Sequence, residues 1–323
     1  MEIFLLTLNQ MLLMFLLILV GIIVRKAKIL PETATLTLSK LETYILVPAL
    51  NFYNWSQKCT VSTLIENSKL ILYGLALLLL AMGLAYPLSK LFVKNPSNDV
   101  ELDYERNIYK YALTFGNYGY VGNFIVLNVW GQDAFFQYSM FVFVISFMCA
   151  SWGLYILAPK SSAEKQTVKS VLKRFFTPPV IAMLIGAVVG ITNTKEFIPD
   201  FVISAASNAG NCMGPIAMIL AGFVVGGYNL KKLFCKKKVY VVTVFRLVVI
   251  PSIFMLLLYF AKIDKAIMTL ALIAFATPLG LNTIIYPASY GKDTSTGAAM
   301  TMVSQTISVI TIPIMYYVFI VGL

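Results

Sequence analysis

The chain has 323 residues, of which 59% are hydrophobic and only 12% are charged, and soluble domains of ordinary composition cannot bury so much apolar surface. Lipid is therefore expected to cover much of it. The sequence has no His and four scattered Cys, which excludes His-based metal sites and Ser/His or Cys/His nucleophile pairs. We expect neither enzymatic activity nor a cofactor. The net charge of +11 is typical of cations crowding the loops of a membrane protein, so no nucleic-acid partner is expected.

Hydropathy along the chain predicts ten membrane-spanning segments. One crossing takes about 20 apolar residues, so ten crossings leave only short loops and no room for a soluble domain. The predicted segments are 7–24, 34–54, 69–92, 108–129, 135–157, 175–192, 199–226, 239–260, 266–288 and 297–321. The first segment lacks a preceding basic region and a small-residue cleavage site, so we interpret it as a retained helix rather than a signal peptide.

Most of the 25 Lys and Arg residues fall into alternate loops, which sets the predicted orientation. Clusters lie near 25–40, 90–110, 160–174 and 231–238, whereas the intervening loops carry few cations. By the positive-inside rule, the cation-rich loops are cytoplasmic. We therefore predict a multi-pass protein of the plasma membrane with both termini outside.

The two halves of the sequence resemble each other, which predicts a duplicated unit of five spans. The matched pairs are Leu19–Val24 with Leu184–Val189, Pro48 with Pro215, and Gly131–Asp133 with Gly291–Asp293, at offsets of 165, 167 and 160 residues. Because five is odd, the second copy must cross the membrane upside down. We expect a first repeat at 1–157, a cytoplasmic linker at 158–174 and an inverted second repeat at 175–323, an organisation typical of secondary transporters.

Helix-breaking residues occupy corresponding places in the fourth and ninth segments. Residues 116–123 hold three Gly and two Asn, and Pro278, Gly280 and Asn282 follow at the 160-residue offset. Taken singly, Gly is most often a packing surface, Pro a tolerated kink and Asn a polar contact between helices. Interruptions at matched positions in both halves instead favour a substrate site built from broken helices.

Several motifs in these segments resemble the auxin efflux carrier family of membrane transporters. They are Leu38–Leu41, Val47–Phe52, Gly116–Gly122, Pro278–Asn282, Tyr290–Asp293 and Val303–Ser308, the last followed by Ile312 and Pro313. The likeness covers nearly the whole chain. The short linker resembles that of the compact bacterial branch rather than that of plant carriers with long loops.

The resemblance implies an all-α integral membrane fold like that of the bile-acid symporters. Ten helices would form two inverted five-helix repeats, with a scaffold of helices 1, 2, 6 and 7 and a transporter domain of helices 3–5 and 8–10. Helices 4 and 9 would be broken and crossed. The implied activity is alternating-access transport of small organic anions, such as an auxin-like monocarboxylate or malate. Phe124 stands where many members have Pro, with Asn123 beside it, which implies a less rigid crossing and a more polar substrate.

A carboxylate at this crossing could be held by neutral hydrogen-bond donors. The candidates are Asn117, Asn123, Asn282, Thr283 and the free N–H groups at each half-helix start. Pro278 is a further site candidate, because it lacks an N–H and leaves backbone acceptors free. Tyr118 would cover an apolar part of the ligand, with a packing role as the alternative. Asn51 and Asn211, in the second and seventh segments, are further candidates from the scaffold side. Helix packing is the alternative for these two residues.

Two ionisable residues within predicted spans are candidates for coupling or for attracting the anion. Arg246 lies about 12 Å along its helix from Lys238, so it either attracts anions or extends to the cytoplasm. Glu42 lies at a similar depth and could pair with Arg246 or bind a coupling proton. The alternative is an interfacial Glu42 paired with Lys40 or another loop cation.

Two other functions stay open at this stage. A sodium-coupled carboxylate or bile-acid-type symporter shares the same repeat logic, with Asn, Thr and carbonyl oxygens as cation ligands. A membrane sensor on a carrier fold would bind a ligand without flux. The expected partners are the lipid bilayer and a small organic anion. A proton or sodium is the candidate coupling ion, and a homodimer is the candidate assembly.

Overall fold

The computed structural model describes residues 2–94, 99–159 and 176–323, and within these ranges the chain forms helices and no strand. Most of the predicted linker, 158–174, lies outside the described residues. The observed helix ends differ from the ends of the predicted spans where a capping motif fixes the start of a helix. The third span was predicted from residue 69, but its helix starts at Val61, because Thr60 and Thr63 form a capping box there.

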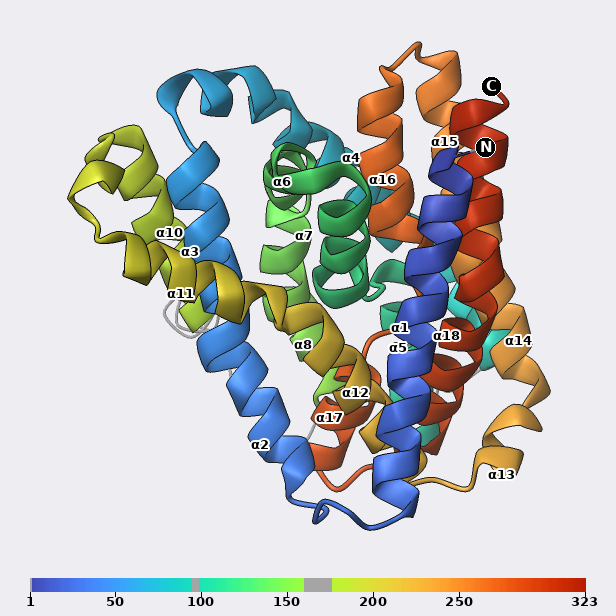
Figure 1. Cartoon of the computed structure of the whole chain (residues 1–323). Helices are drawn as coiled ribbons and strands as arrows, with labels where there is room; N and C mark the ends of the chain where they lie inside the picture. The colour runs from blue at the N-terminus through green and yellow to red at the C-terminus, as the bar shows by residue number, and fades with distance from the viewer. Residues whose placement is uncertain (1, 95–98, 160–175) are drawn as a thin grey trace.

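The first part of the chain contains one long straight helix, one helix with a π-helical turn, and a second long helix (Figure 1). These elements are α1 (Glu2–Lys26), then α2 (Ala34–Leu41), η1 (Glu42–Leu46) and α3 (Val47–Lys58) in direct succession, and α4 (Val61–Phe92).

The elements that follow are interrupted. They are α5 (Val100–Thr114), η2 (Tyr118–Gly122), α6 (Asn123–Phe141), α7 (Phe143–Met148), η3 (Cys149–Gly153) and α8 (Leu154–Leu157). Gly131 lies within α6 at φ 80° and ψ −169°, so the helix is kinked there by a backbone conformation that only Gly adopts readily.

The second part of the chain has a similar alternation. Its elements are α10 (Pro178–Ile191), η5 (Thr194–Phe197), α11 (Asp200–Asn211), α12 (Met213–Gly226), α13 (Leu230–Phe234), α14 (Lys237–Val244), η6 (Phe245–Val249), α15 (Ile250–Phe260), α16 (Lys265–Ala276), α17 (Asn282–Ser289), α18 (Ser295–Tyr316) and η7 (Tyr317–Val321). Gly291, the sequence counterpart of Gly131, also has a positive φ, 66°.

Helices from the two halves pack closely through glycines. A Cβ at Gly21 of α1 would collide with the carbonyl oxygen of Ile219 in α12. A Cβ at Gly186 of α10 would lie 2.8 Å from the carbonyl oxygen of Phe52 in α3. Each crossing therefore depends on the absence of a side chain at its glycine. Figure 1 shows the α3–α10 pair on the side of the molecule away from α1 and α18.

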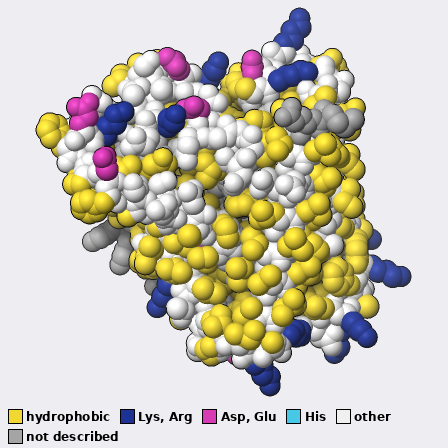
Figure 2. Space-filling model, in the orientation of Figure 1, with side chains coloured by type: hydrophobic (Ala, Val, Ile, Leu, Met, Phe, Trp, Pro, Cys, Tyr) yellow, Lys and Arg dark blue, Asp and Glu magenta, His cyan; other side chains and the backbone are white. Residues whose placement is uncertain are grey.

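The surface of the molecule is apolar around its middle. Figure 2 shows hydrophobic side chains covering a broad band, with charged side chains gathered toward the two ends. Large exposed apolar residues on α1, such as Leu16 (62% exposed) and Ile23 (61%), contribute to this surface. A soluble monomer would not carry so large a patch, so the band is suited to contact with lipid.

The described residues include five helical segments that are long and apolar enough to cross a membrane, or six when one bent pair is included. The five are Ile3–Lys26, Val61–Phe92, Asp200–Gly226, Lys237–Phe260 and Ser295–Val321, and the bent pair is Val100–Phe141 with Phe143–Leu157. α10 and α16 are apolar but shorter. The protein is thus an all-helical, multi-pass membrane protein, and the predicted count of ten spans stays a prediction.

Candidate functional site at two helix breaks

Two interruptions of helical structure meet inside the molecule. α5 ends at Thr114 and η2 starts at Tyr118, which leaves residues 115–117 as the first break. α16 ends at Ala276 and α17 starts at Asn282, which leaves residues 277–281 as the second break. The backbone N–H of Asn117 donates a hydrogen bond to the carbonyl oxygen of Pro278 at 2.7 Å, so the two breaks are in direct contact.

Arg246 lies where the two half-helices end. Its side chain on η6 is 1% exposed, and Nη1 donates a hydrogen bond to the carbonyl oxygen of Thr114, the last residue of α5, at 3.2 Å. A Cβ at Gly116 would collide with both Arg246 Nη2 and Thr277, the residue that follows α16. Because each helix C-terminus carries about half a negative charge, one guanidinium between two such ends balances the local charge.

The burial of these side chains excludes three sequence-based interpretations of the ionisable residues. The Arg246 side chain is buried and does not extend to the surface. The pair with Glu42 is not formed, because both Glu42 oxygens and Arg246 Nε and Nη2 have no hydrogen-bond partner among the described residues. Glu42 is also 0% exposed, so it is not an interfacial residue paired with Lys40.

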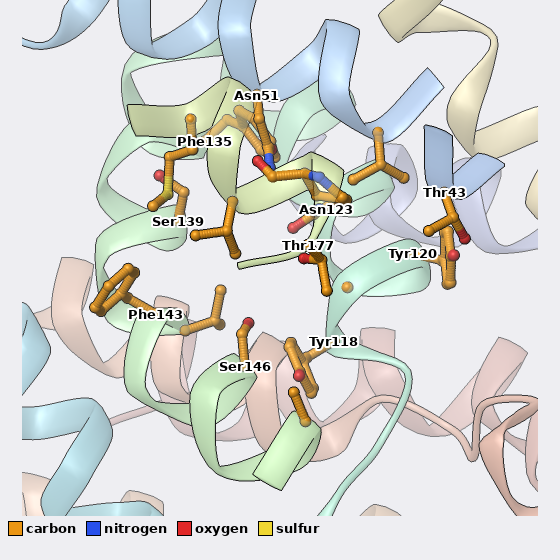
Figure 3. A pocket seen from close by; sticks show the side chains of 17 residues that line it. Thr43, Asn51, Tyr118, Tyr120, Asn123, Phe135, Ser139, Phe143, Ser146 and Thr177 are labelled. Atoms are coloured by element: carbon orange, nitrogen blue, oxygen red, sulfur yellow. The ribbon is translucent and has the colours of Figure 1, made fainter. Parts of the chain in front are cut away.

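A cavity of about 250 Å³ lies beside the first break (Figure 3). The polar side chains that the described residues contribute to its lining are neutral, namely two Asn amides and six hydroxyl groups. The polar residues are Thr43 and Asn51 from η1 and α3, Tyr118, Tyr120 and Asn123 from η2 and α6, Ser139 and Ser146 from α6 and α7, and Thr177 before α10. Figure 3 shows Asn51 and Asn123 toward one end of the cavity and Tyr118 and Ser146 toward the other.

A chain of polar side chains joins the second break to this cavity. Asn282 Nδ2 donates a hydrogen bond to the Tyr111 hydroxyl at 2.7 Å. That hydroxyl shares a hydrogen bond with Cys149 Sγ at 3.2 Å. Cys149 in turn interacts with the side chain of Tyr118, which also interacts with Ser146 in the cavity wall. Asn282 is thereby linked to the cavity without lining it.

The second break is filled by side chains from α18. The N–H of Leu279 donates to Ser304 Oγ at 2.9 Å, and Thr301 Oγ1 donates to the carbonyl oxygen of Gly280 at 3.3 Å. Gln305 Nε2 donates to the carbonyl oxygen of Leu279 at 3.5 Å. The N–H of Leu279 and the carbonyl oxygens of Pro278, Leu279 and Gly280 are therefore bonded within the protein.

The predicted site residues fall into three groups. Asn51, Tyr118 and Asn123 line the cavity. Four lie at or beside the breaks: Asn117, Pro278 and Thr283 are buried, and Asn282 is partly buried. Thr283 Oγ1 has no hydrogen-bond partner in the described structure. Asn211 is exposed and lines a different hollow, together with Phe124 and Gln132.

Sequence reasoning missed the hydroxyls of Thr43, Ser139, Ser146 and Thr177. Single hydroxyls within apolar helices are common and carry little signal, since most of them bond to their own backbone. Ser139, for example, donates a hydrogen bond to the carbonyl oxygen of Phe136 in its own helix at 2.7 Å. Only the fold shows that these helix faces meet around one cavity.

The turn after the first break is held against α3. Asn54 Nδ2 donates to the side-chain oxygen of Gln132 at 2.8 Å and to its carbonyl oxygen at 3.1 Å. Lys58 Nζ forms an ion pair with Asp133 Oδ1 at 2.7 Å. Asp133 therefore tethers this turn to the neighbouring helix.

Comparison with known proteins agrees that this is a membrane protein. The family model described as "Membrane transport protein" matches residues 6–316, which is nearly the whole chain. No curated protein sequence matches. Because the family model spans far more than half of the chain, the protein belongs to this family of membrane transporters, the auxin efflux carrier family, and is not an enzyme.

Proposed function

We propose that the protein is a secondary active transporter of small organic anions, and that the anion binds in the cavity beside the first break. The observation that carries this proposal is the donor-rich lining of the cavity, whose described polar side chains are neutral and come from the first half of the chain and from Thr177. Its volume of about 250 Å³ is below the range typical of drug-sized ligands, and it suits a metabolite with few carbon atoms.

The chemistry of the lining fits a carboxylate. The amides of Asn51 and Asn123 can each donate to an anionic oxygen, although Asn51 Nδ2 also donates to the carbonyl oxygen of Pro179 at 3.1 Å. η2 and the part of α6 before Gly131 follow each other without a break, and their first N–H groups lie beside the cavity, where the helix dipole favours negative charge. Neutral donors would bind the anion without a permanent opposite charge that slows its release.

The substrate class that we propose includes auxin-like monocarboxylates and dicarboxylates such as malate. The six lining hydroxyls favour the more polar members, because a hydroxylated dicarboxylate can use more of these groups than an aromatic monocarboxylate can. Tyr118 and Tyr120 provide aromatic faces for the less polar members.

The packing supports a ten-helix fold of two inverted repeats. Gly21 meets Ile219, and Gly186 meets Phe52. The two glycines are 165 residues apart and their partners are 167 apart, close to the offsets between the sequence motifs. Each contact is thus the counterpart of the other, with the roles of the two halves exchanged. Such an arrangement suits alternating access about a site near the middle of the membrane.

We further propose that the protein lies in the plasma membrane with both termini outside, on the grounds of its loop cations. The scaffold would comprise α1–α3 and α10–α12, and the remaining helices would form the mobile transporter domain.

The proposal is tested by flux into proteoliposomes with radiolabelled malate and indole-3-acetate, in parallel with protein-free liposomes. We expect saturable flux and exchange of at least one anion by the wild type, and a lower affinity in Asn123→Ala. The matched control is Asn67→Ala, whose amide bonds only to its own helix at Thr63. Flux that does not saturate, or an Asn123→Ala variant with wild-type affinity, contradicts the proposed site.

A further inference from the structure

Glu42 is a buried carboxyl group without a partner. Its side chain is 0% exposed, and neither oxygen has a hydrogen-bond partner in the described part of the chain. It lies in the π-helical turn η1, one residue before Thr43, which lines the cavity. The mechanism proposed above makes no use of it, and a buried polar group left unpaired needs a physical explanation.

Few titratable groups face Glu42 from the elements packed around η1. Tyr120, from η2, interacts electrostatically with the Glu42 carboxyl and with Tyr286. The flanking helices α2 and α3 carry Lys40, Tyr53 and Lys58, of which Lys40 is exposed and Lys58 forms an ion pair with Asp133. α10, α11 and α12 also pack against η1. α10 and α12 contain no Asp, Glu, Lys, Arg, Tyr or Cys, and α11 contains only Asp200, at its first position. Within the described structure, no cation is placed to balance a charged Glu42.

The lack of a hydrogen-bond or ion-pair partner determines the protonation state of the Glu42 carboxyl. Burying an isolated carboxylate costs several kcal/mol even after the protein relaxes, whereas the neutral acid avoids most of this penalty. Glu42 is therefore protonated in this conformation. A metal ion is a poor substitute for the proton, because hard cations take several oxygen ligands and no hydrogen-bonding oxygen reaches the Glu42 carboxyl.

The position of Glu42 links the proton to the cavity. The Tyr120 side chain interacts with that of Thr43, and both residues line the cavity. Because Tyr120 lies in η2, which follows the first break, any movement of the broken helix away from η1 separates Tyr120 from Glu42 and admits water. A hydrated carboxyl loses its proton, and a dry one regains it.

We propose that Glu42 is the proton-binding site that couples anion movement to a pH gradient, an inference that rests on the transport function proposed above. The carboxyl takes up a proton from one side of the membrane, stays neutral while Tyr120 of η2 lies beside it, and releases the proton on the other side. The anion and the proton cross together, and no other chemical change occurs.

The test compares wild type, Glu42→Gln and Glu66→Gln in proteoliposomes at clamped membrane voltage, with radiolabelled malate as the probe. Glu66 is an exposed acid on α4 that bonds to Ser62, and it serves as the matched control. A gradient of one pH unit can drive up to about tenfold accumulation for each coupled proton. We expect this accumulation in the wild type and in Glu66→Gln, and its complete loss in Glu42→Gln.

Wild-type protein alone provides a second measurement, which stands even if Glu42→Gln does not fold. A pH-sensitive dye inside the vesicles should report proton movement together with malate at clamped voltage. Three results would overturn the Glu42 proposal alone. They are malate flux that does not respond to the pH gradient, malate flux that follows a sodium gradient instead, and malate flux that is still driven by pH in Glu42→Gln. Absence of saturable flux for any anion in the wild type overturns the transport proposal first, and the coupling proposal with it.

Discussion

The two helix breaks occupy matched places in the sequence but differ in what fills them. The first break adjoins a cavity of about 250 Å³ with a neutral polar lining. The second is closed by Thr301, Ser304 and Gln305 from α18, which bond to its backbone. Both breaks release backbone groups from regular helical hydrogen bonding. What fills each break is therefore set by the helix that packs against it, which at the second break is α18. One break adjoins a cavity, and three backbone groups of the other are bonded by side chains of α18.

This difference assigns separate tasks to the two breaks. The open break is suited to binding, because its helix start faces a space that a carboxylate can enter. The closed break is suited to support, because the Pro278 carbonyl oxygen accepts a hydrogen bond from Asn117 and so holds the first break in place. Substitutions at the first break should therefore change binding, and those at the contact between the breaks should change stability.

The largest effect is expected at the contact itself. Gly116→Ala places a methyl group against Arg246 and the Thr277 backbone, and we expect a loss of about 2–3 kcal/mol of unfolding free energy from overpacking. Gly119→Ala is the matched control, because a Cβ at Gly119 meets nothing within 4 Å. Thermal unfolding in detergent measures both. Equal melting temperatures for the two variants would contradict the close contact between the breaks.

The next effect concerns the charge between the half-helices. Arg246→Met removes the donor to the Thr114 carbonyl and leaves two helix ends without a counter-charge, so we expect a loss of about 2 kcal/mol. Arg246→Lys should restore part of this, because it keeps the charge but loses the planar geometry. The measurement is again the melting temperature. An Arg246→Met variant as stable as the wild type would show that the guanidinium does not support the breaks.

A smaller effect separates the two breaks by function. Asn123→Ala removes a donor from the cavity, so we expect about a tenfold loss of anion affinity, the equivalent of one hydrogen bond to a charged group. Asn282→Ala removes the hydrogen bond to Tyr111 and should cost about 1 kcal/mol of stability. Saturation of flux and thermal unfolding are measured on both variants. The assignment of tasks fails if Asn282→Ala loses more affinity than Asn123→Ala.

The smallest effect lies in the turns that follow the breaks. Asp133 pairs with Lys58, whereas Asp293 accepts hydrogen bonds from the N–H and hydroxyl of Ser295 at the start of α18. Partial burial raises the pKa of Asp293, but the Ser295 hydrogen bonds and nearby Lys236 outweigh burial and hold the pKa below its ordinary value. Asp293 therefore stabilises the fold at neutral pH, and this contribution is lost as the pH falls through the folded-state pKa.

Asp293→Asn should accordingly melt slightly below the wild type at neutral pH, with the difference vanishing in acid. Melting curves recorded between neutral and acidic pH measure this difference. A gap that widened toward low pH would contradict the sign of the pKa shift at Asp293.

The helix breaks were the part of the site that local sequence could predict. Gly116 and Asn117 are poor helix formers, and Pro278 lacks an N–H, so the chain itself carries the interruption. The matched turns were also predictable in part, because Gly131 and Gly291 both adopt a positive φ. Such features depend on the conformational limits of one residue and its nearest neighbours.

Tertiary packing decided the features that sequence alone left open. Whether a break holds a ligand depends on which side chains of a distant helix reach it, and nothing near Leu279 in sequence predicts Ser304 as its partner. The depth of Arg246 was ambiguous for the same reason, since a helix position alone does not show whether the side chain turns inward. Asn211 and Asn51 appeared equivalent in sequence, yet only Asn51 lines the cavity.

The most direct test of the central claim is a cryo-electron microscopy map of the protein with a saturating concentration of the anion selected by the flux measurements. The account predicts density for the anion between Asn51, Tyr118 and Asn123, with the second break still closed by α18. An empty cavity together with anion density against Asn282 or Ser304 would contradict it.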